Sequence, residues 1–497
     1  MSSEAGTVAI GSAPLEAERS TGRIKSLAPS RRRAALVALG GMAVVSLFLV
    51  FAAANRPSQL SPVTHEGFFP GWMAGPFGGL LPGLPNGIIA TRVIFTACLI
   101  VLIILYLIVL RGANQVPARA VIAAIVAVQL IYMLSPPLAT TDIFNYINYA
   151  RMEAIHNLNP YTTIPVSEPH SDPAFLVSNW HQLLSPYGPT FTLITMALVP
   201  LGVAGTMWGL KALFTLASLA LVALVWRFAK VLGRDPVPAV AFMGLNPIVL
   251  IWGIGGGHND FLMMLAVLGG LYLLVRGEML AAHEEPRNAL WPPDARFIAA
   301  GVTFVFAVSL KASAAVVLPV ALAYAWPRRR ALVQMLAGMA AGGLAFGIAT
   351  LAVFGPHLPD ISAQSSLVTP ESVPNLVGLA LGFGGETQGL HTLSFVLLGA
   401  TVAAAAWYAL RRRDVLTPVG WVSIAVLLPL SWVLPWYILW VLPIAAVSSS
   451  RRLRIASLLV GLYLVISPVS VWRVLGVHPE STPLGHLHER EVDELLH

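Results

Sequence analysis

The chain has 497 residues, of which 57% are hydrophobic and 11% charged, and its formal net charge is +7. Water-soluble domains keep about a quarter of their residues charged, so this composition excludes a soluble enzyme. Most of the basic charge lies on arginines in short clusters between apolar segments, which indicates membrane orientation rather than nucleic-acid binding. Cys98 is the single cysteine, so the chain can form no intramolecular disulfide and no cysteine metal cluster.

The amino-terminal segment is polar and rich in small residues, which predicts a disordered tail over residues 1–33. The first apolar run, 34–54, directly follows three arginines. Basic residues flanking a membrane span favour the cytoplasmic side, so the amino terminus is predicted to be cytoplasmic. A long outer loop is then expected over residues 139–187, after the third span.

Apolar windows long enough to cross a bilayer recur along the chain. Placing every later basic cluster on the cytoplasmic side requires an odd number of crossings after each outer loop. On this rule, 297–326 splits into two short crossings with Lys311 at the outer turn. Residues 419–447 likewise make two crossings, whereas 189–205 is re-entrant or interfacial.

These assignments predict an all-α, polytopic membrane domain over residues 34–473. It would contain roughly 13 transmembrane helices. A polar tail, residues 474–497, follows. All the loops with unusual polar residues then fall on one outer face.

Asp142 stands at the start of the 139–187 loop, a few residues beyond the third span. Apolar residues recur at helical spacing from Thr141 onward, which predicts an amphipathic juxtamembrane helix along the interface. Asp142 can act there as a general base on an acceptor hydroxyl. It can equally be a first-turn acid behind a Thr141 N-cap, and the two interpretations are compatible.

The same loop holds further candidates for substrate binding. Asp172 is a second carboxylate, although an Asp-Pro turn is its simpler explanation. Trp180 and Tyr187 could stack on sugar rings, or could anchor the loop at the interface, where Trp and Tyr gather.

A second cluster reads GGGHND over residues 255–260. Three glycines at a membrane boundary predict a tight turn with exposed backbone amides, a plausible anion site. His258 could donate to a phosphate oxygen and Asp260 could orient it, with Asn259 between them. Glycine turns also commonly join membrane helices.

Lys311 is one of only four lysines and interrupts an apolar stretch. An ionisable group at membrane depth is costly and suggests a function, here binding a phosphate, because no carboxylate is near in sequence. The alternative is a side chain that reaches the interface for hydration. Trp436 and Tyr437 belong to a third aromatic cluster on the outer side.

The sequence contains no Walker A motif and no GxGxxG before a cytoplasmic helix. A sugar donor would therefore have to arrive within the membrane. A transporter or lipid flippase is a more distant alternative, but no internal repeat is visible and the polar groups gather at one face.

Several stretches together resemble the actinobacterial polyprenol-phosphate-mannose-dependent α(1→6)-mannosyltransferases of the GT-C superfamily. The matching stretches are TTDIFNYINYAR, NPY, SDPAFLVSNWHQLLSPYGP, LNPIVLIWGIGGGHNDFLM, SLKASAAVVLP and LPWYILW. The chain reads Asp-Ile-Phe-Asn-Tyr from Asp142, where the family tends to read Asp-Val-Tyr-Ser-Tyr, and the acceptor stays open.

The resemblance implies a GT-C bundle with an extracytoplasmic active site and with Asp142 as the base. Tyr146 and Tyr161, within matching motifs, are expected to bind substrate. The implied reaction is an inverting transfer of mannose from polyprenyl-phosphate mannose to an α(1→6)-mannan of a lipomannan-type lipoglycan. No metal or other cofactor is expected, because Lys311 and His258 would stabilise the departing phosphate. Another lipid-phosphate sugar donor, such as a glucose, arabinose or galactose donor, is the nearest alternative.

Overall fold

A computed structural model of the chain describes residues 15–55, 69–81, 83, 88–281, 293–360 and 367–469. Every regular element within these ranges is a helix, which confirms the all-α prediction. The predicted polar tail 474–497 lies outside the described residues.

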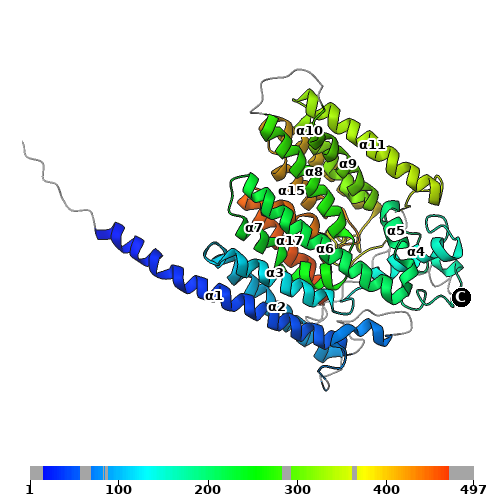
Figure 1. The fold of residues 1–497 in the computed structure, drawn as a ribbon, viewed down its shortest axis with the longest axis horizontal. Coiled ribbons are helices and arrows are strands. Elements are labelled where there is room, and N and C mark those ends of the chain that lie inside the picture. Colours follow the sequence, from blue (N-terminus) through cyan, green and yellow to red (C-terminus); the bar gives the residue numbers. More distant parts are fainter. Residues whose placement is uncertain are drawn as a thin grey trace, which may run out of the picture.

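Three helices form the amino-terminal part: α1 (Leu15–Ala54), α2 (Ile88–Gly112) and α3 (Ala118–Met133). Helix α1 packs against both α2 and α3 and projects from the body of the molecule (Figure 1). It begins at Leu15, inside the segment predicted to be disordered. Leu, Glu, Ala and Arg, all good helix formers, dominate its first turns and explain the difference.

The long outer loop contains α4 (Asp142–His156) and leads to α5 (Pro189–Met196), with a 3₁₀ turn η4 (Pro165–Ser167) between them. A further turn, η5 (Val199–Leu201), joins α5 to the next long helix. Helix α5 has only eight residues, too few to cross a bilayer alone.

The central layer consists of α6 (Gly202–Val231), α7 (Pro236–Gly244), the π-helix η6 (Val249–Gly255) and α8 (Asp260–Ala281). The axes of α7 and η6 meet at an angle of 62°. This bend places the end of η6 beside α3, and α6 packs against both α7 and α8. The glycine-rich turn therefore lies inside the bundle.

Lys311 separates α9 (Ala295–Leu310) from the 3₁₀ turn η7 (Ala312–Val317) and α10 (Leu318–Ala325). Its backbone is extended, with φ −158° and ψ 121°, so the helix is broken at the residue where the sequence predicted a turn. Helix α11 (Arg329–Phe354) then packs along α9.

The carboxyl-terminal elements close the bundle around η8, which lies against α8, η6 and α17. They are α13 (Val373–Ala380), α14 (Gln388–Arg412), α15 (Leu416–Ala425), η8 (Pro435–Trp440), α16 (Leu442–Val447) and α17 (Arg451–Val469).

Six helices of the described part are long and apolar enough to span a membrane, or seven if the bent pair α7 and η6 is one span. The predicted count of 13 crossings is not confirmed. Part of the difference comes from five apolar helices of only 10–17 residues, including those around Lys311. At 1.5 Å per residue these are roughly 15 to 26 Å long, shorter than a hydrocarbon core of about 30 Å.

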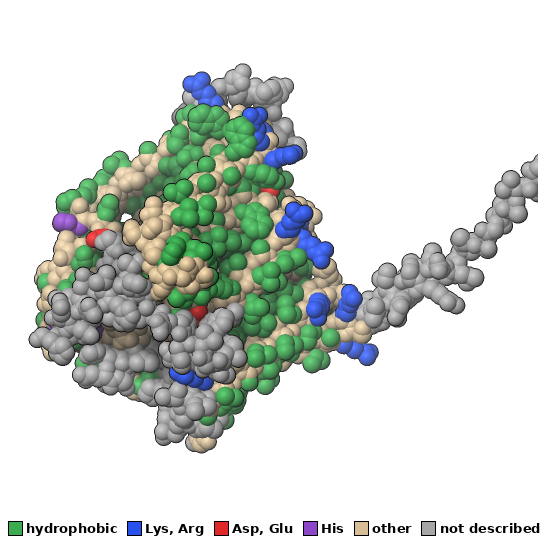
Figure 2. All heavy atoms as spheres, turned by 180° about the vertical axis from the view of Figure 1, so that it is seen from behind, with side chains coloured by type: hydrophobic (Ala, Val, Ile, Leu, Met, Phe, Trp, Pro, Cys, Tyr) green, Lys and Arg blue, Asp and Glu red, His purple; other side chains and the backbone are tan. Residues whose placement is uncertain are grey.

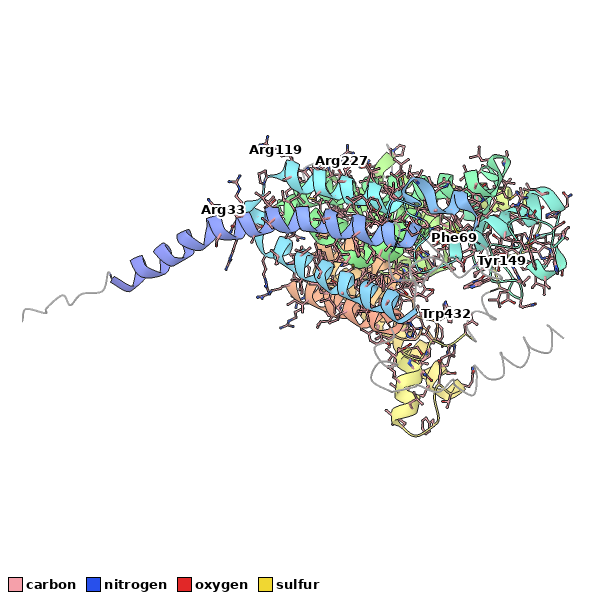
Figure 3. All side chains as sticks on the ribbon, turned by 90° about the horizontal axis from the view of Figure 1, so that it is seen from below. Arg33, Phe69, Arg119, Tyr149, Arg227 and Trp432 are labelled. Atoms are coloured by element: carbon pink, nitrogen blue, oxygen red, sulfur yellow. The ribbon has the colours of Figure 1, made fainter. Side chains whose placement is uncertain are left out.

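The surface supports a membrane setting. Figure 2 shows a broad hydrophobic face, with Lys and Arg side chains along one edge of the molecule. Arg33, Arg119 and Arg227 lie toward one end, whereas Tyr149 and Trp432 lie toward the other (Figure 3).

Candidate active site

Asp142 is the first residue of α4, and its backbone N–H donates to Thr140 Oγ1 at 3.2 Å. The predicted N-cap by the Thr141 side chain is not formed. The first eleven residues of α4, from Asp142 to Met152, are all buried, so the helix does not lie amphipathically along an interface as predicted. The reason is that the rest of the loop covers it: Asn145 Oδ1 accepts the backbone N–H groups of Asn179 and Trp180.

The Asp142 carboxylate faces His258. Asp142 Oδ2 lies 3.6 Å from His258 Nδ1, and Tyr146 Oη lies 3.3 Å from the same nitrogen. The imidazole is fully buried and stacks on the Trp436 indole, with ring centroids 3.7 Å apart. Four of the predicted site residues, from α4, the glycine turn and η8, therefore meet in one place.

Burial raises the pKa of Asp142 to about 7; the nearby charge of Lys311 opposes this rise, and the Asp260 carboxylate adds to it. A carboxyl group with a pKa near neutrality is suited to accept a proton during a reaction. The coupling also shows that Lys311 lies close enough to act on Asp142.

The glycine turn positions His258 by folding back on η6. Gly257 has a φ of +75°, which a residue with a side chain rarely adopts. The N–H groups of Gly256, Gly257 and His258 donate to carbonyls of Ile251 and Gly253 at 3.0–3.1 Å. These amides are thus not free for an anion, contrary to the prediction for this turn.

Asp260 pairs with Lys311 rather than orienting His258. Lys311 Nζ lies 2.8 Å from Asp260 Oδ1, and Trp440 Nε1 donates to the same oxygen. The Lys311 ammonium also lies 5.2 Å from the ring centre of Tyr437 and 5.3 Å from that of Trp440. The lysine side chain is 18% exposed and the aspartate 0%, so only the lysine of this pair can be reached from outside.

The long outer loop ends against the Lys311 break. Gly188 N donates to Leu310 O at 3.2 Å, and a Cβ at Gly188 would lie 2.1 Å from Ser309 O. Only glycine permits this backbone contact. The next residue back, Tyr187, packs edge-to-face on Tyr146 with ring centroids 4.6 Å apart.

Several buried polar atoms of these residues have no hydrogen-bond partner within the described part of the chain. They are Asn145 Nδ2, Tyr187 Oη, His258 Nε2, both amide atoms of Asn259, and Asp260 Oδ2. Buried polar groups are ordinarily satisfied, so these atoms are the ones that a polar ligand or ordered water would satisfy here. Hydroxyl-rich sugars supply both donors and acceptors.

Asp172 lies outside this group. It forms an ion pair with Arg151 at 2.8 Å and approaches His156 Nε2 at 2.8 Å, and it accepts the Ala174 N–H. Burial alone would raise the pKa of Asp172, but the hydrogen bonds from these three groups hold it below its ordinary value. Its contacts fasten the loop to α4.

Tyr161 and Trp180 also serve the loop. Tyr161 Oη donates to Tyr187 O at 3.0 Å and lies 2.8 Å from Thr192 Oγ1. The Trp180 side chain is half-buried, and its backbone N–H donates to Asn145 Oδ1. Neither side chain contacts Asp142 or Lys311 in any recorded polar interaction.

Sequence reasoning missed Lys211 and left Trp440 without a role. Lys211 is fully buried in α6 and donates to groups just outside the site. Its position in an apolar helix was the pattern that could have identified it. No group of three or more His, Cys, Asp or Glu in the described residues could hold a metal ion.

The apolar helices and the enclosed polar site define a helical, polytopic membrane protein. The profile of the family described as "Alpha-(1->6)-mannopyranosyltransferase, N-terminal domain" matches residues 41–328, more than half of the chain. The chain belongs to this family and is a glycosyltransferase of the α-1,6-mannosyltransferase type. The matched part includes Asp142, His258 and Lys311, but not η8.

Two relatives illustrate the similarity. Alpha-(1->6)-mannopyranosyltransferase A of Mycobacterium tuberculosis is 31% identical over 382 residues, which cover 70% of this chain and 68% of the relative. Alpha-(1->6)-mannopyranosyltransferase B of Corynebacterium glutamicum is 28% identical over 347 residues, 63% of this chain and 56% of the relative. No solved structure matches the chain.

Proposed function

We propose that the enzyme transfers mannose from polyprenyl-phosphate mannose to the 6-hydroxyl of an α(1→6)-mannan acceptor of a cell-envelope lipoglycan. The main support for this proposal is that Asp142, His258 and the Lys311–Asp260 pair lie together among buried polar atoms without hydrogen-bond partners in the described residues. The Asp142 carboxylate can accept a proton, and the Lys311 ammonium can attract an anion. A glycosyl transfer from a lipid phosphate requires both.

Asp142 is the base in this mechanism. The acceptor hydroxyl attacks the anomeric carbon, its proton passes to the Asp142 carboxylate, and the bond from that carbon to the phosphate oxygen breaks. Polyprenyl phosphate leaves with the electron pair. A single displacement of this kind inverts the anomeric centre, so a β-linked donor gives the α product.

Lys311 is the group that attracts the departing phosphate. Its ammonium is held by Asp260 Oδ1 and by two aromatic faces, and it remains partly exposed. A cation fixed in advance stabilises charge as it develops and needs no rearrangement. The metal-free reaction proposed here assigns this role to Lys311.

His258 is better suited to bind the sugar acceptor than to bind the donor phosphate. With Asp142 ionised, a proton on His258 Nδ1 points at the carboxylate 3.6 Å away. In the neutral imidazole Nε2 then carries a lone pair, which accepts from a hydroxyl but repels a phosphate oxygen. The unsatisfied Nε2 is therefore assigned to a sugar hydroxyl.

The orientation proposed here has a cytoplasmic amino terminus and an extracytoplasmic site. Arg33, Arg119 and Arg227 lie toward the end opposite the one occupied by Tyr149 of α4 (Figure 3). Arginines near membrane helices favour the cytoplasmic side. Donor and acceptor would then meet at the outer face.

The test is transfer from labelled polyprenyl-phosphate mannose to an α(1→6)-dimannoside by the reconstituted enzyme. Wild type is expected to form the α(1→6)-trisaccharide, and Asp142→Asn to lose about 10²–10⁴-fold in rate. Asp294→Asn, at a carboxylate that pairs with Arg296 away from the site, is the matched control. Absence of transfer by wild type, or transfer only from a glucose, arabinose or galactose donor, contradicts the proposal.

A further inference from the structure

Lys211 is a buried lysine that the proposed chemistry does not use. Its side chain lies in α6, within a candidate membrane span, and is 0% exposed. Nζ donates to Ser135 Oγ at 3.1 Å, to Pro136 O at 3.4 Å and to Gly255 O at 3.0 Å. The amino group of Lys211 thus lies within hydrogen-bond distance of three acceptors.

The three acceptors belong to the ends of two helices. Ser135 and Pro136 follow Leu134, the C-cap residue of α3, and Gly255 is the last residue of η6. The carboxyl-terminal ends of helices carry partial negative charge, which favours a cation. None of the three acceptors is a carboxylate; one is the carbonyl of the last residue of η6, and the other two lie just beyond α3.

The same two helix ends lead into the active site. From Pro136 the chain continues to Asp142, and from Gly255 it continues to His258. The Leu138 N–H donates to Gly255 O at 3.0 Å, so this carbonyl receives both the backbone of the Asp142 segment and the Lys211 ammonium. This shared carbonyl therefore links residues 135–142 to residues 255–258.

We propose that Lys211 is a positioning residue that joins residues 135–142 to residues 255–258 and so sets the approach of Asp142 to His258. It touches neither substrate nor the reacting atoms. The catalytic part of this inference rests on the proposed function, because it takes Asp142 as the base. The structural part, the joining of the two segments, does not.

The kinetic test compares Lys211→Met with Thr215→Val in nanodiscs. Thr215 is also buried in α6, one turn further on, and its hydroxyl donates only to Lys211 O of the same helix. Lys211→Met is expected to lower kcat per folded molecule by about tenfold to a hundredfold, because a misplacement of about 1 Å can have this effect. The KM for the donor should stay unchanged, since Lys211 has no recorded contact with Lys311.

The pH profile separates positioning from simple stabilisation. Burial is the main cause of the raised pKa of Asp142. If the two segments separate, water reaches the carboxylate, its pKa falls, and the acid limb of kcat moves to lower pH. A kcat per folded molecule and an acid limb equal to those of wild type would overturn the proposal.

A double-mutant cycle uses a second partner of the ammonium. Ser135→Ala removes one of the three acceptors. If both side chains act through the same link, the losses for Ser135→Ala and Lys211→Met combine less than additively. Additive losses would contradict a shared link. Should Lys211→Met fail to fold, Ser135→Ala alone carries the comparison with Thr215→Val.

Hydrogen exchange gives a readout that needs no activity. Lys211→Met should speed amide exchange in both 135–142 and 249–258, with the Leu138 amide among the most affected, whereas Thr215→Val should not. Exchange confined to α6 would overturn the proposal. If wild type transfers no mannose, the proposed function fails, and this measurement still decides whether Lys211 joins the two segments.

Discussion

Asp142 combines a raised pKa with two neighbouring charges of opposite sign. A base works only when it is deprotonated, so kcat/KM is expected to rise as the pH increases through about 7 and then to level off. A profile that is flat between pH 5 and 9 would contradict the assignment. The measurement is the initial rate of mannose transfer across buffers of constant ionic strength.

Lys311 lowers the pKa of Asp142, so its removal should move that profile. Lys311→Met takes away a positive charge that favours the carboxylate, the pKa of Asp142 rises, and the acid limb shifts to higher pH. Asp260→Asn takes away a negative charge and should shift the limb to lower pH. Shifts in the same direction for both variants would show that the two charges do not act on Asp142 as described.

Lys311 is also the residue on which a metal-free reaction depends. Addition of EDTA is expected to leave the rate of wild type unchanged, whereas Lys311→Met should raise the KM for the donor and lower kcat. Lys311→Arg, which keeps the charge, should recover part of the loss. A rate that falls with EDTA and returns with Mg²⁺ would assign the phosphate to a metal instead.

At the scale of the element, α4 and the loop after it behave as one unit because Asp172 joins them. Its pair with Arg151 is buried on both sides. Asp172→Asn should destabilise the loop by about 3–5 kcal/mol, as expected when one partner of a buried ion pair is removed. Faster proteolysis within 157–187 would report this, with Asp235→Asn, at the exposed start of α7, as the control.

The pH dependence of this loop has a defined sign. The pKa of Asp172 is lower in the folded loop than its ordinary value of about 3.9. The stabilisation is therefore fully present above that ordinary value and is lost as the pH falls through the lower, folded value. Loop protection that stays constant down to pH 2 would contradict the role given to the ion pair.

Sequence reasoning predicted some of these elements because their causes are local. The break at Lys311 follows from a charge within an apolar run, and the positive φ at Gly257 follows from its place in a glycine turn. The ion pair of Lys311 with Asp260 joins residues 51 positions apart, so no spacing rule could reveal it. The burial of α4 depends on a loop that folds back over it, which hydrophobic periodicity does not report.

At the scale of the whole molecule, the arginines labelled toward one end and Tyr149 of α4 toward the other predict which parts face outward (Figure 3). In a Cys98→Ala background, Ser171→Cys in the outer loop should react with an impermeant maleimide in intact cells. Ser449→Cys, between α16 and α17, should react only after the membrane is permeabilised. Both serines are exposed, so accessibility depends on the side of the membrane. Reversed labelling would overturn the orientation.

The membrane class follows from composition, yet the number of crossings does not. Charge clusters constrain only whether a crossing number is odd or even, so they favour short crossings at apolar helices such as α15 and α10 that are too short to be full spans. Polar residues within apolar sequence are costly and rare, so the sequence could single out Asp142, His258 and Lys311 as candidates without knowledge of the topology.

The backbone of Gly188 attaches the long outer loop to the end of α9, a helix that is synthesised much later. Domains generally fold from the amino terminus during synthesis, but the backbone contact of Gly188 with Ser309 and Leu310 cannot form until α9 has been inserted. Until α9 has been made, the loop lacks this backbone contact. Assembly of the site is in this way a late step of biogenesis, and chains truncated before α9 would leave the loop open to extracytoplasmic proteases.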